Sequence, residues 1–308
     1  MQLIYGIENY QPGSRDLYLA LGNFDGVHRG HQSLIERANQ RKSNGGISAA
    51  FIFEPHPAQL LTPQHMPLLL GTAQRKARLL ESIGLDLLIY NPFTRDIASL
   101  SPEQFVRHFL VEGLEVKEIF VGFNYSFGFK GAGSPETLQQ LGEQYGFGVQ
   151  VVDPVTVDGE LVSSSSVRQA LEEGDIHRAS RMLGYAPILD GVVVEGERRG
   201  RLLGFPTANV GIEKIYSIPA KGVYAARAEV ESKVYDAVVN IGSKPTFHEE
   251  YPVSVEAHLF DFAGDIYGRP ISLSFAEKIR DEKRFDGLEA LAAQIGKDAQ
   301  TARLILHP

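Results

Sequence analysis

His28 and His31 lie three residues apart in the stretch GNFDGVHRGH, just beyond two glycines. The residues before this stretch, LYLAL at 17–21, are apolar and short, as in a buried strand. The residues after it carry apolar side chains at helical spacing as far as Asn-Gly-Gly at 44–46, which terminates a helix. The histidines therefore lie on a strand-to-helix turn. Exposed backbone N–H groups and the positive end of the helix dipole favour an anion there, usually phosphate.

Three interpretations of this histidine pair follow from the local sequence. As metal ligands, histidines at this spacing need further His, Cys or carboxylate partners, and no HExxH pattern accompanies them. As structural residues, one would cap the helix or pack while the other is solvated. As phosphate ligands, both would turn to one side and donate hydrogen bonds to a triphosphate. The neighbouring glycines favour phosphate, but other parts of the chain must decide.

Short apolar strands and amphipathic helices alternate from residue 17 to about residue 184. This alternation predicts an α/β domain with a doubly wound parallel sheet, in which ligands bind outside the carboxyl ends of the strands. His28 and His31 follow such an end, which supports the phosphate interpretation. The predicted strands are 17–21, 47–53, 86–90, 118–122 and 147–153.

The pattern changes after Gly184, which we take as the boundary between domains 1–184 and 185–308. Strand-like segments then follow one another with brief polar turns and no helix between them. This pattern is typical of an antiparallel barrel or sandwich. The chain ends in two predicted helices, LEALAAQI and DAQTARLIL, separated by Gly296. The predicted strands of this mostly β half include 222–230, 234–242, 253–262 and 270–279.

Two further stretches of the first half should lie at the edge of the sheet that faces the histidines. The stretch VGFNYSFGFKGAG at 121–133 follows a strand, and Asn124 within it can read a ribose or base through its amide. The stretch VSSSSVRQAL at 162–171 places serines before a helix that carries Arg168. Hydroxyls and arginine suit phosphate binding and the neutralisation of a pyrophosphate leaving group. A polar N-cap with a surface arginine is the simpler alternative.

The second half has its own candidate site in the stretch GERRGRLLGFPTANVG at 196–211, where arginines and glycines lead to Thr207 and Asn209. A hydroxyl and an amide oxygen two residues apart are hard ligands that suit Mg²⁺ bound against nucleotide phosphates. A hairpin turn with incidental polar residues is the alternative. Glu256 alternates with the apolar residues of its strand and faces away from them. A solvated strand glutamate is the simpler interpretation of that position.

Composition narrows the class of protein. A chain of 308 residues is long enough for two domains with separate cores. The formal net charge of −8 argues against broad binding to nucleic acid or to an anionic membrane. Cysteine is absent, which excludes disulfides, iron–sulfur clusters and thiol catalysis. Neither a signal pattern nor a bilayer-length apolar run is present, so we expect a cytoplasmic protein whose partners are small molecules.

These stretches, taken in order, resemble the family of bacterial bifunctional riboflavin kinase/FMN adenylyltransferases, or FAD synthetases, from about residue 15 to the C-terminus. GNFDGVHRGHQ resembles the HxGH signature of its nucleotidyltransferase, and FEPHP, GFNYSFG and SSSSVR resemble three further adenylyltransferase segments. GFPTAN, NIGSKPTF at 240–247, VEAHLFDF and KIRDEKRFD resemble its kinase domain. Because these matches occur in the same order across both halves of the chain, they are highly specific for this family.

The resemblance implies a Rossmann-like nucleotidyltransferase domain followed by a six-stranded antiparallel β-barrel with C-terminal helices. It implies that riboflavin and ATP give FMN, and that FMN and a second ATP give FAD and pyrophosphate. His28 and His31 become catalytic phosphate clamps, and Glu256 becomes the general base of the kinase. The other implied contacts are Asn23, Phe24, Asn124, Ser164 and Arg168 for ATP in the first domain, Gly204, Thr207 and Asn209 for ATP and phosphate in the second, Thr207 and Asn209 for Mg²⁺, and Arg280 and Phe285 for flavin.

Two alternatives use the same fold. The chain could be a non-catalytic flavin or nucleotide sensor, or an enzyme with only one working activity. The joint presence of His28, His31, Thr207, Asn209 and Glu256 argues against the sensor, because a sensor needs no base. Both a monomer and a weak homo-oligomer are compatible with the sequence.

Overall fold

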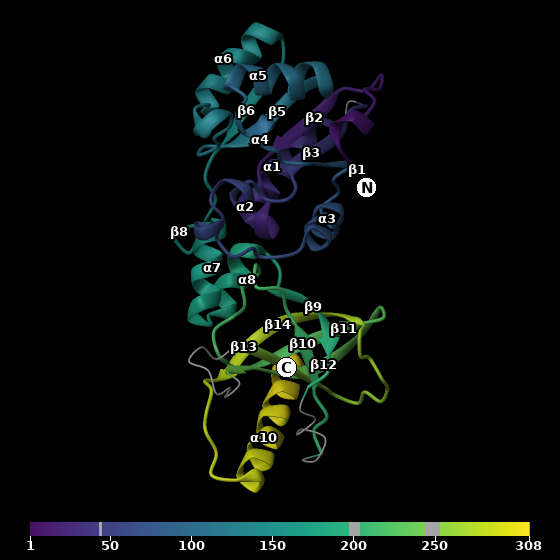
Figure 1. Cartoon of the computed structure of the whole chain (residues 1–308), viewed down its shortest axis with the longest axis vertical. Coiled ribbons are helices and arrows are strands. Elements are labelled where there is room, and N and C mark those ends of the chain that lie inside the picture. The colour runs from purple at the N-terminus through teal and green to yellow at the C-terminus, as the bar shows by residue number, and fades with distance from the viewer. Residues whose placement is uncertain (43–44, 197–203, 244–252, 308) are drawn as a thin grey trace. The chain divides into compact units, whose positions relative to one another are not determined.

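The computed structural model describes residues 1–42, 45–196, 204–243 and 253–307 (Figure 1). The chain forms two compact units, of which the first comprises Met1–Pro67 and Ala73–Ser163. The second comprises Leu68–Thr72 and Ser164–Pro308. Helices α7 (Ser164–Glu173) and α8 (Ile176–Leu183) therefore group with the second unit, although they precede the domain boundary expected at Gly184.

The first unit is built on a six-stranded parallel sheet with the strand order β1-β4-β3-β2-β5-β6. The predicted parallel α/β domain is thus confirmed. The strand order reverses between β2 and β5, so the carboxyl ends of these two strands flank the crevice in which doubly wound sheets bind ligands. The strands are β1 (Gln2–Tyr5), β2 (Leu17–Leu21), β3 (Ile47–Phe53), β4 (Leu87–Asn91), β5 (Val116–Gly122) and β6 (Gly148–Val152).

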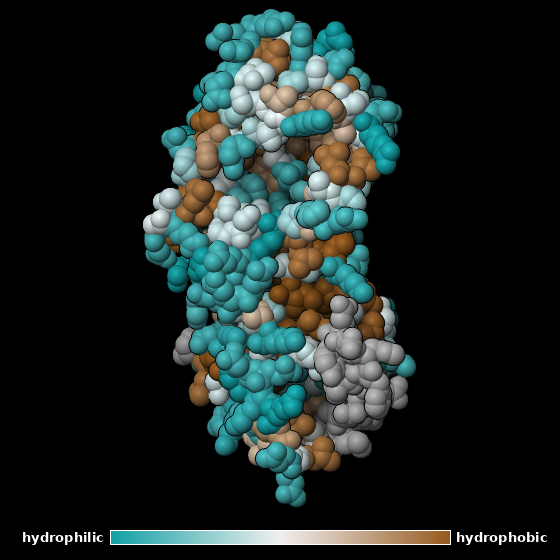
Figure 2. All heavy atoms as spheres, turned by 60° about the vertical axis from the view of Figure 1, so that its left-hand side comes forward, coloured by the Kyte–Doolittle hydropathy of each residue, from teal (hydrophilic) through white to brown (hydrophobic). Residues whose placement is uncertain are grey.

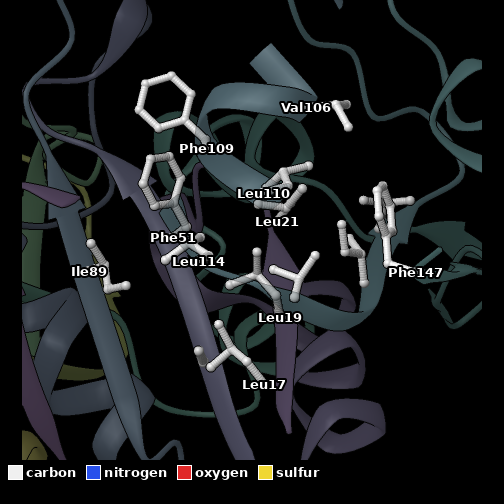
Figure 3. Close-up of a cluster of buried hydrophobic side chains, with 14 of the residues drawn as sticks. Leu17, Leu19, Leu21, Phe51, Ile89, Val106, Phe109, Leu110, Leu114 and Phe147 are labelled. Atoms are coloured by element: carbon white, nitrogen blue, oxygen red, sulfur yellow. The ribbon is translucent and has the colours of Figure 1, made fainter. Parts of the chain in front are cut away.

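Strand β2 is buried at every position because helices cover both faces of the sheet. Its odd residues pack into one apolar cluster with Phe51 and with Phe109 of a π-helical segment, Val106–Gly113 (Figure 3). Its even residues pack into a second cluster with α1 and α3. The helices of this unit are α1 (Arg29–Arg41), α2 (Pro57–Leu61), α3 (Ala73–Ser82), α4 (Arg95–Ala98), α5 (Pro102–Phe105) and α6 (Pro135–Tyr145).

The second unit contains a closed antiparallel barrel of six strands in the order β10-β13-β12-β11-β14-β9, as the family resemblance implied. Helix α10 (Leu288–Leu306) packs on the outside of β11, β12 and β14 (Figure 1). The barrel strands are β9 (Ile188–Val194), β10 (Ala208–Gly211), β11 (Gly222–Val230), β12 (Lys233–Ser243), β13 (Val253–Leu259) and β14 (Pro270–Arg280).

The prediction of two C-terminal helices is wrong, because α10 continues through Gly296 without a break. Glycine weakens a helix but does not end it where tertiary packing supplies the stability. A Cβ built on Gly296 would lie 3.8 Å from Cζ of Phe205, which is ordinary van der Waals contact.

We therefore expect Gly296→Ala to stabilise the protein. Alanine loses less backbone entropy than glycine on folding into a helix, and the gain is about 0.5–1 kcal/mol. Thermal unfolding followed by circular dichroism should show a higher midpoint for the variant. A lower midpoint would mean that the contact with Phe205 does not tolerate a methyl group.

Hydrophilic residues cover much of the face shown in Figure 2, and hydrophobic residues gather there in smaller patches. Some of the exposed apolar side chains, such as those of Val192 and Val194, lie on the barrel strand β9. Single exposed apolar residues of this kind are normal on a protein surface. None of the helices within the described residues is long and apolar enough to cross a membrane.

Candidate active sites

The turn at residues 23–28, between β2 and α1, ends in His28 at the carboxyl edge of the sheet, and His31 follows in the first turn of α1. Phe24, Gly26 and Val27 have φ angles of 50°, 77° and 37°, all in the left-handed region. This region is costly for a phenylalanine and especially for a β-branched valine. The side chains of Phe24 and Val27 are fully buried in the second apolar cluster, which includes residues of α1 and α3. The hydrophobic core therefore holds this turn in a strained conformation.

His28 is the N-cap of α1. Its Nδ1 accepts a hydrogen bond from the backbone N–H of His31 at 3.3 Å, and its ring is buried. A neutral ring whose Nδ1 accepts a hydrogen bond carries its proton on Nε2, which becomes its donor. The interpretation of the two histidines as structural residues is thus confirmed in part, because His28 caps helix α1.

The His31 ring stacks on that of His28, with centroids 3.6 Å apart and an interplanar angle of 18°. It also contacts the buried ring of Phe24, at 5.1 Å. Burial, and then electrostatic interactions with His28 and Lys76, hold the pKa of His31 well below its usual range. The buried Nδ1 of His31 has no hydrogen-bond partner among the described residues. His31 is therefore uncharged at neutral pH, and its ring is positioned by stacking.

A metal site at His28 and His31 would need further ligand side chains close to them. Within the described residues, no group of three or more His, Cys, Asp or Glu side chains is placed to hold a metal ion. The other histidine of a motif in this unit, His56 of FEPHP, caps α2 by accepting a hydrogen bond from the N–H of Ala58 at 3.1 Å. The role of His28 and His31 as phosphate ligands stays a prediction.

Lys76 lies beside the histidine turn, and the sequence analysis missed it. It lies on α3, is 8% exposed, and donates a hydrogen bond from Nζ to the carbonyl oxygen of Asn23 at 2.9 Å. Burial lowers the pKa of Lys76, while the carboxylates of Glu54 and Asp25 oppose this shift. A single lysine in an amphipathic helix forms no recognisable pattern, so only the fold reveals its place beside the histidine turn.

The remaining candidates of the adenylyltransferase fall into two groups. Asn23 and Phe24 belong to the histidine turn, and the exposed Asn124 follows β5 at the same edge of the sheet. Ser164 begins α7 in the second unit, and Arg168 of that helix donates from Nε to the carbonyl oxygen of Leu68 at 2.6 Å. The structure thus gathers the first group within one unit and the second group in the other, and the roles of both groups stay predictions.

A row of polar side chains crosses three strands of the barrel. Asn209 of β10 pairs in register with Glu256 of β13, which pairs in turn with Asn240 of β12. Directly opposed residues on neighbouring strands point to the same side of a sheet. The alternate β13 residues Val255 and Ala257 are buried inside the barrel, so this row faces outward. Asn209 is buried and Glu256 is half-buried, which distinguishes Glu256 from a fully solvated strand glutamate.

Gly196 provides the space for the amide of Asn209. A Cβ built on Gly196 would lie 2.0 Å from Nδ2 and 2.4 Å from Cγ of Asn209. Because the asparagine side chain is short and buried, it has to move away from a methyl group at that position.

If Asn209 positions the phosphates in a riboflavin kinase, as the family resemblance implies, Gly196→Ala should slow FMN formation from riboflavin by on the order of 10²-fold, since displacement of a substrate-positioning group by about 1 Å can have an effect of this size. FAD formation from supplied FMN should be unchanged. Product chromatography with each substrate separates the two rates. A wild-type rate of FMN formation in the variant would show that Asn209 needs no such space.

The approach to Asn209 is fixed by contacts with β13. The Phe205 ring packs edge-on against the His258 ring at 5.4 Å, and His258 Nδ1 is 2.8 Å from the carbonyl oxygen of Pro206. Thr207 is half-buried directly before β10, and Gly204 has a φ of 83°, which glycine adopts without strain. The arginines predicted to crowd this loop, and residues 244–247 of the NIGSKPTF stretch, lie outside the described residues.

The flavin candidates Arg280 and Phe285 lie together. Arg280 ends β14 and forms a bidentate ion pair with Asp298 of α10, with Nε–Oδ1 3.0 Å and Nη2–Oδ2 2.7 Å. Its guanidinium lies 5.7 Å from the centre of the Phe285 ring. Asp298 is 3% exposed and also accepts a hydrogen bond from Gln294. The sequence analysis missed Asp298, because it lies 18 residues away from its partner.

Comparisons with known proteins agree with this two-part architecture. A family model described as FAD synthetase matches residues 11–166, and one described as riboflavin kinase matches residues 183–306. Proteins named bifunctional riboflavin kinase/FMN adenylyltransferase are similar along almost the whole chain. The relative from Bacillus subtilis is 40% identical over 92% of this chain and 90% of its own, and that from Pseudomonas fluorescens is 38% identical over 100% and 99%. The relative from Escherichia coli K12 is 38% identical over 98% and 97%.

A solved structure has the same fold throughout. It is a crystal structure described as that of a macrolide-efflux protein from Streptococcus pneumoniae, with a TM-score of 0.87 and 29% identity over 98% of this chain and 99% of that chain. Both family models and the full-length relatives lead to one conclusion. This chain belongs to the family of bacterial bifunctional riboflavin kinase/FMN adenylyltransferases.

Proposed function

We propose that this chain makes FMN from riboflavin and ATP at the barrel, and FAD from FMN and a second ATP at the parallel sheet. The observation that carries this proposal is the presence of two separate polar sites in one chain of this family. One is the stacked His28–His31 pair at the sheet edge, and the other is the Asn209–Glu256 pair on the barrel. We assign the first activity to residues 185–308 and the second to residues 1–184.

In adenylyl transfer, a phosphate oxygen of FMN attacks the α-phosphorus of ATP, a new P–O bond forms, and the bond to pyrophosphate breaks. The FMN phosphate is already anionic, so this step needs no strong base. His28 and His31 donate hydrogen bonds to the phosphates and stabilise the negative charge of the transition state. Asn124 orients the nucleotide, while Ser164 and Arg168 neutralise the departing pyrophosphate. Positioning and charge neutralisation supply most of the catalysis.

In the kinase step, the terminal ribityl hydroxyl of riboflavin attacks the γ-phosphorus of ATP, and ADP leaves. A neutral hydroxyl is a poor nucleophile, so a base that takes its proton accelerates the step. Glu256 supplies this base from the outer face of β13. Gly204, Thr207 and Asn209 position the phosphates, while Arg280 and Phe285 contact the flavin.

The residues near Asn209 fit a magnesium ion that is bound together with substrate phosphates. The Thr207 hydroxyl and the Asn209 amide oxygen are hard donors, and this ion usually completes its shell with phosphates and water rather than with an all-protein cage. When bound, the ion neutralises phosphate charge in the kinase transition state.

We further propose that the chain acts in the cytoplasm on small-molecule substrates, as a monomer or weak homo-oligomer. The absence of cysteine is compatible with a reducing compartment.

Incubation with riboflavin, ATP and Mg²⁺ tests the proposed function. FMN should form first and then be converted to FAD, and a parallel reaction with FMN and ATP should give FAD directly. The non-catalytic sensor would bind flavin or nucleotide and form neither product. An enzyme with one working activity would stop at FMN, or would form FAD only from supplied FMN.

A further inference from the structure

The contacts of Lys76 link α3 to the turn that carries the histidines. Its Nζ donates to the carbonyl oxygen of Asn23 at 2.9 Å, and α3 packs against the turn beside Asp25. Lys76 is 8% exposed and Asp25 is 4% exposed. A lysine is almost never buried to this degree unless its charge is compensated. The compensation here comes from the carboxylates of Glu54 and Asp25 and from the Asn23 carbonyl.

The hydrogen bond from Lys76 to the Asn23 carbonyl lies at the start of the turn that leads to the histidines. Asn23 directly precedes Phe24, the first residue of the turn with a left-handed backbone. The ring of Phe24 contacts that of His31, which stacks on His28. A charge-assisted hydrogen bond to the Asn23 carbonyl therefore fixes the start of a strained segment that ends in His28 and leads directly to His31 on α1.

We propose that Lys76 is a positioning residue for adenylyl transfer, which holds the turn at residues 23–28 and thereby the imidazole pair in the geometry that receives phosphate. This inference rests on the proposed function of that pair. Lys76 acts through Asn23 and Phe24 rather than by contact with the reacting atoms.

The charge of Lys76 has a second consequence at the same site. Burial, His28 and Lys76 all lower the pKa of His31, and the other charged groups that face this cluster are Asp25 on the turn and Glu54 after β3. Removing the lysine removes one positive neighbour, so the pKa of His31 rises. This shift reports the loss of the positive charge beside His31, whereas recovery of the rate by a charged replacement reports the positioning role.

The test compares Lys76→Met, Lys76→Gln and Lys76→Arg with Lys42→Met as the matched control. Lys42 also donates to a backbone carbonyl, that of Gly84 at 2.7 Å, but lies at the other end of α1. We expect Lys76→Met to lower kcat for FAD formation from FMN by about 10²-fold, with FMN formation unchanged. The NMR titration midpoint of His31 should move to higher pH, and the pH profile of FAD formation should move with it. Lys76→Arg should recover part of the rate and the wild-type midpoint, and Lys42→Met should match the wild type in all of these measurements.

If Lys76→Met fails to fold, Lys76→Gln replaces it, because glutamine removes the charge but keeps a buried donor. A folded Met or Gln variant with the wild-type kcat for FAD formation would overturn the proposal. So would a Lys76→Arg variant that is as slow as Lys76→Met, because a charged donor at this position should recover part of the rate. A wild-type protein that makes no FAD from FMN would instead contradict the proposed function itself.

Discussion

Glu256→Gln is expected to slow FMN formation from riboflavin by about 10²–10⁴-fold, the usual contribution of a general base. Glutamine preserves the size of the side chain and its place beside Asn209, but it cannot accept the proton of the ribityl hydroxyl. FAD formation from supplied FMN should be unchanged, because that step takes place in the other domain. The two rates are measured by separating FMN from FAD after reaction with each substrate.

A matched control distinguishes this role from that of an ordinary strand glutamate. Glu229 is also half-buried on a barrel strand, β11, but its register neighbours there are Val234 and Ser272 rather than Asn209 and Asn240. Glu229→Gln should leave both rates unchanged. Equal rates for Glu256→Gln and the control would mean that Glu256 is only a polar residue on the surface of the barrel.

His31→Ala is expected to slow FAD formation by about 10²–10³-fold, the effect of losing one preorganised donor to the transition state. The substitution keeps the backbone N–H of residue 31, so the cap formed by Nδ1 of His28 remains in place. Replacing His31 therefore tests the phosphate contact alone, whereas replacing His28 would also remove the cap of helix α1. FMN formation should not change.

Thermal unfolding of the same preparation separates catalysis from stability. If His31 only packs against Phe24, its loss should lower the melting temperature, and FAD formation should fall only in proportion to the unfolded fraction. His65→Ala is a suitable control, because His65 is exposed in the same unit. A folded His31→Ala variant that forms FAD at the normal rate would contradict the phosphate clamp.

The sequence predicted the fold class and most of the strands because buried parallel strands and alternating barrel strands have strong local patterns. Strand β3 was predicted to the residue, and so was β11. Strand β1 was missed because its four residues form an edge strand with only one buried side chain. Helix α10 was divided at Gly296 because local propensity takes no account of its packing against β11 and β12.

The sites were predictable only where a short motif carries the chemistry. His28 and His31 are neighbours in sequence, so their spacing on a helix start could be recognised. The pairing of Asn209 with Glu256 depends on strand register, which joins residues distant in the chain. Lys76 and Asp298 are single residues in helices, and their burial against Asn23 and Arg280 arises only from tertiary packing.

The central claim is that one chain contains two independent active sites that act in succession. The most direct test mixes the Glu256→Gln and His31→Ala variants with riboflavin, ATP and Mg²⁺. Alone, the first variant should leave riboflavin unconverted and the second should accumulate FMN. Together they should form FAD, because each supplies the site that the other lacks. A mixture that forms no FAD, from two folded variants that have each lost both activities, would contradict the assignment of the two reactions to separate sites.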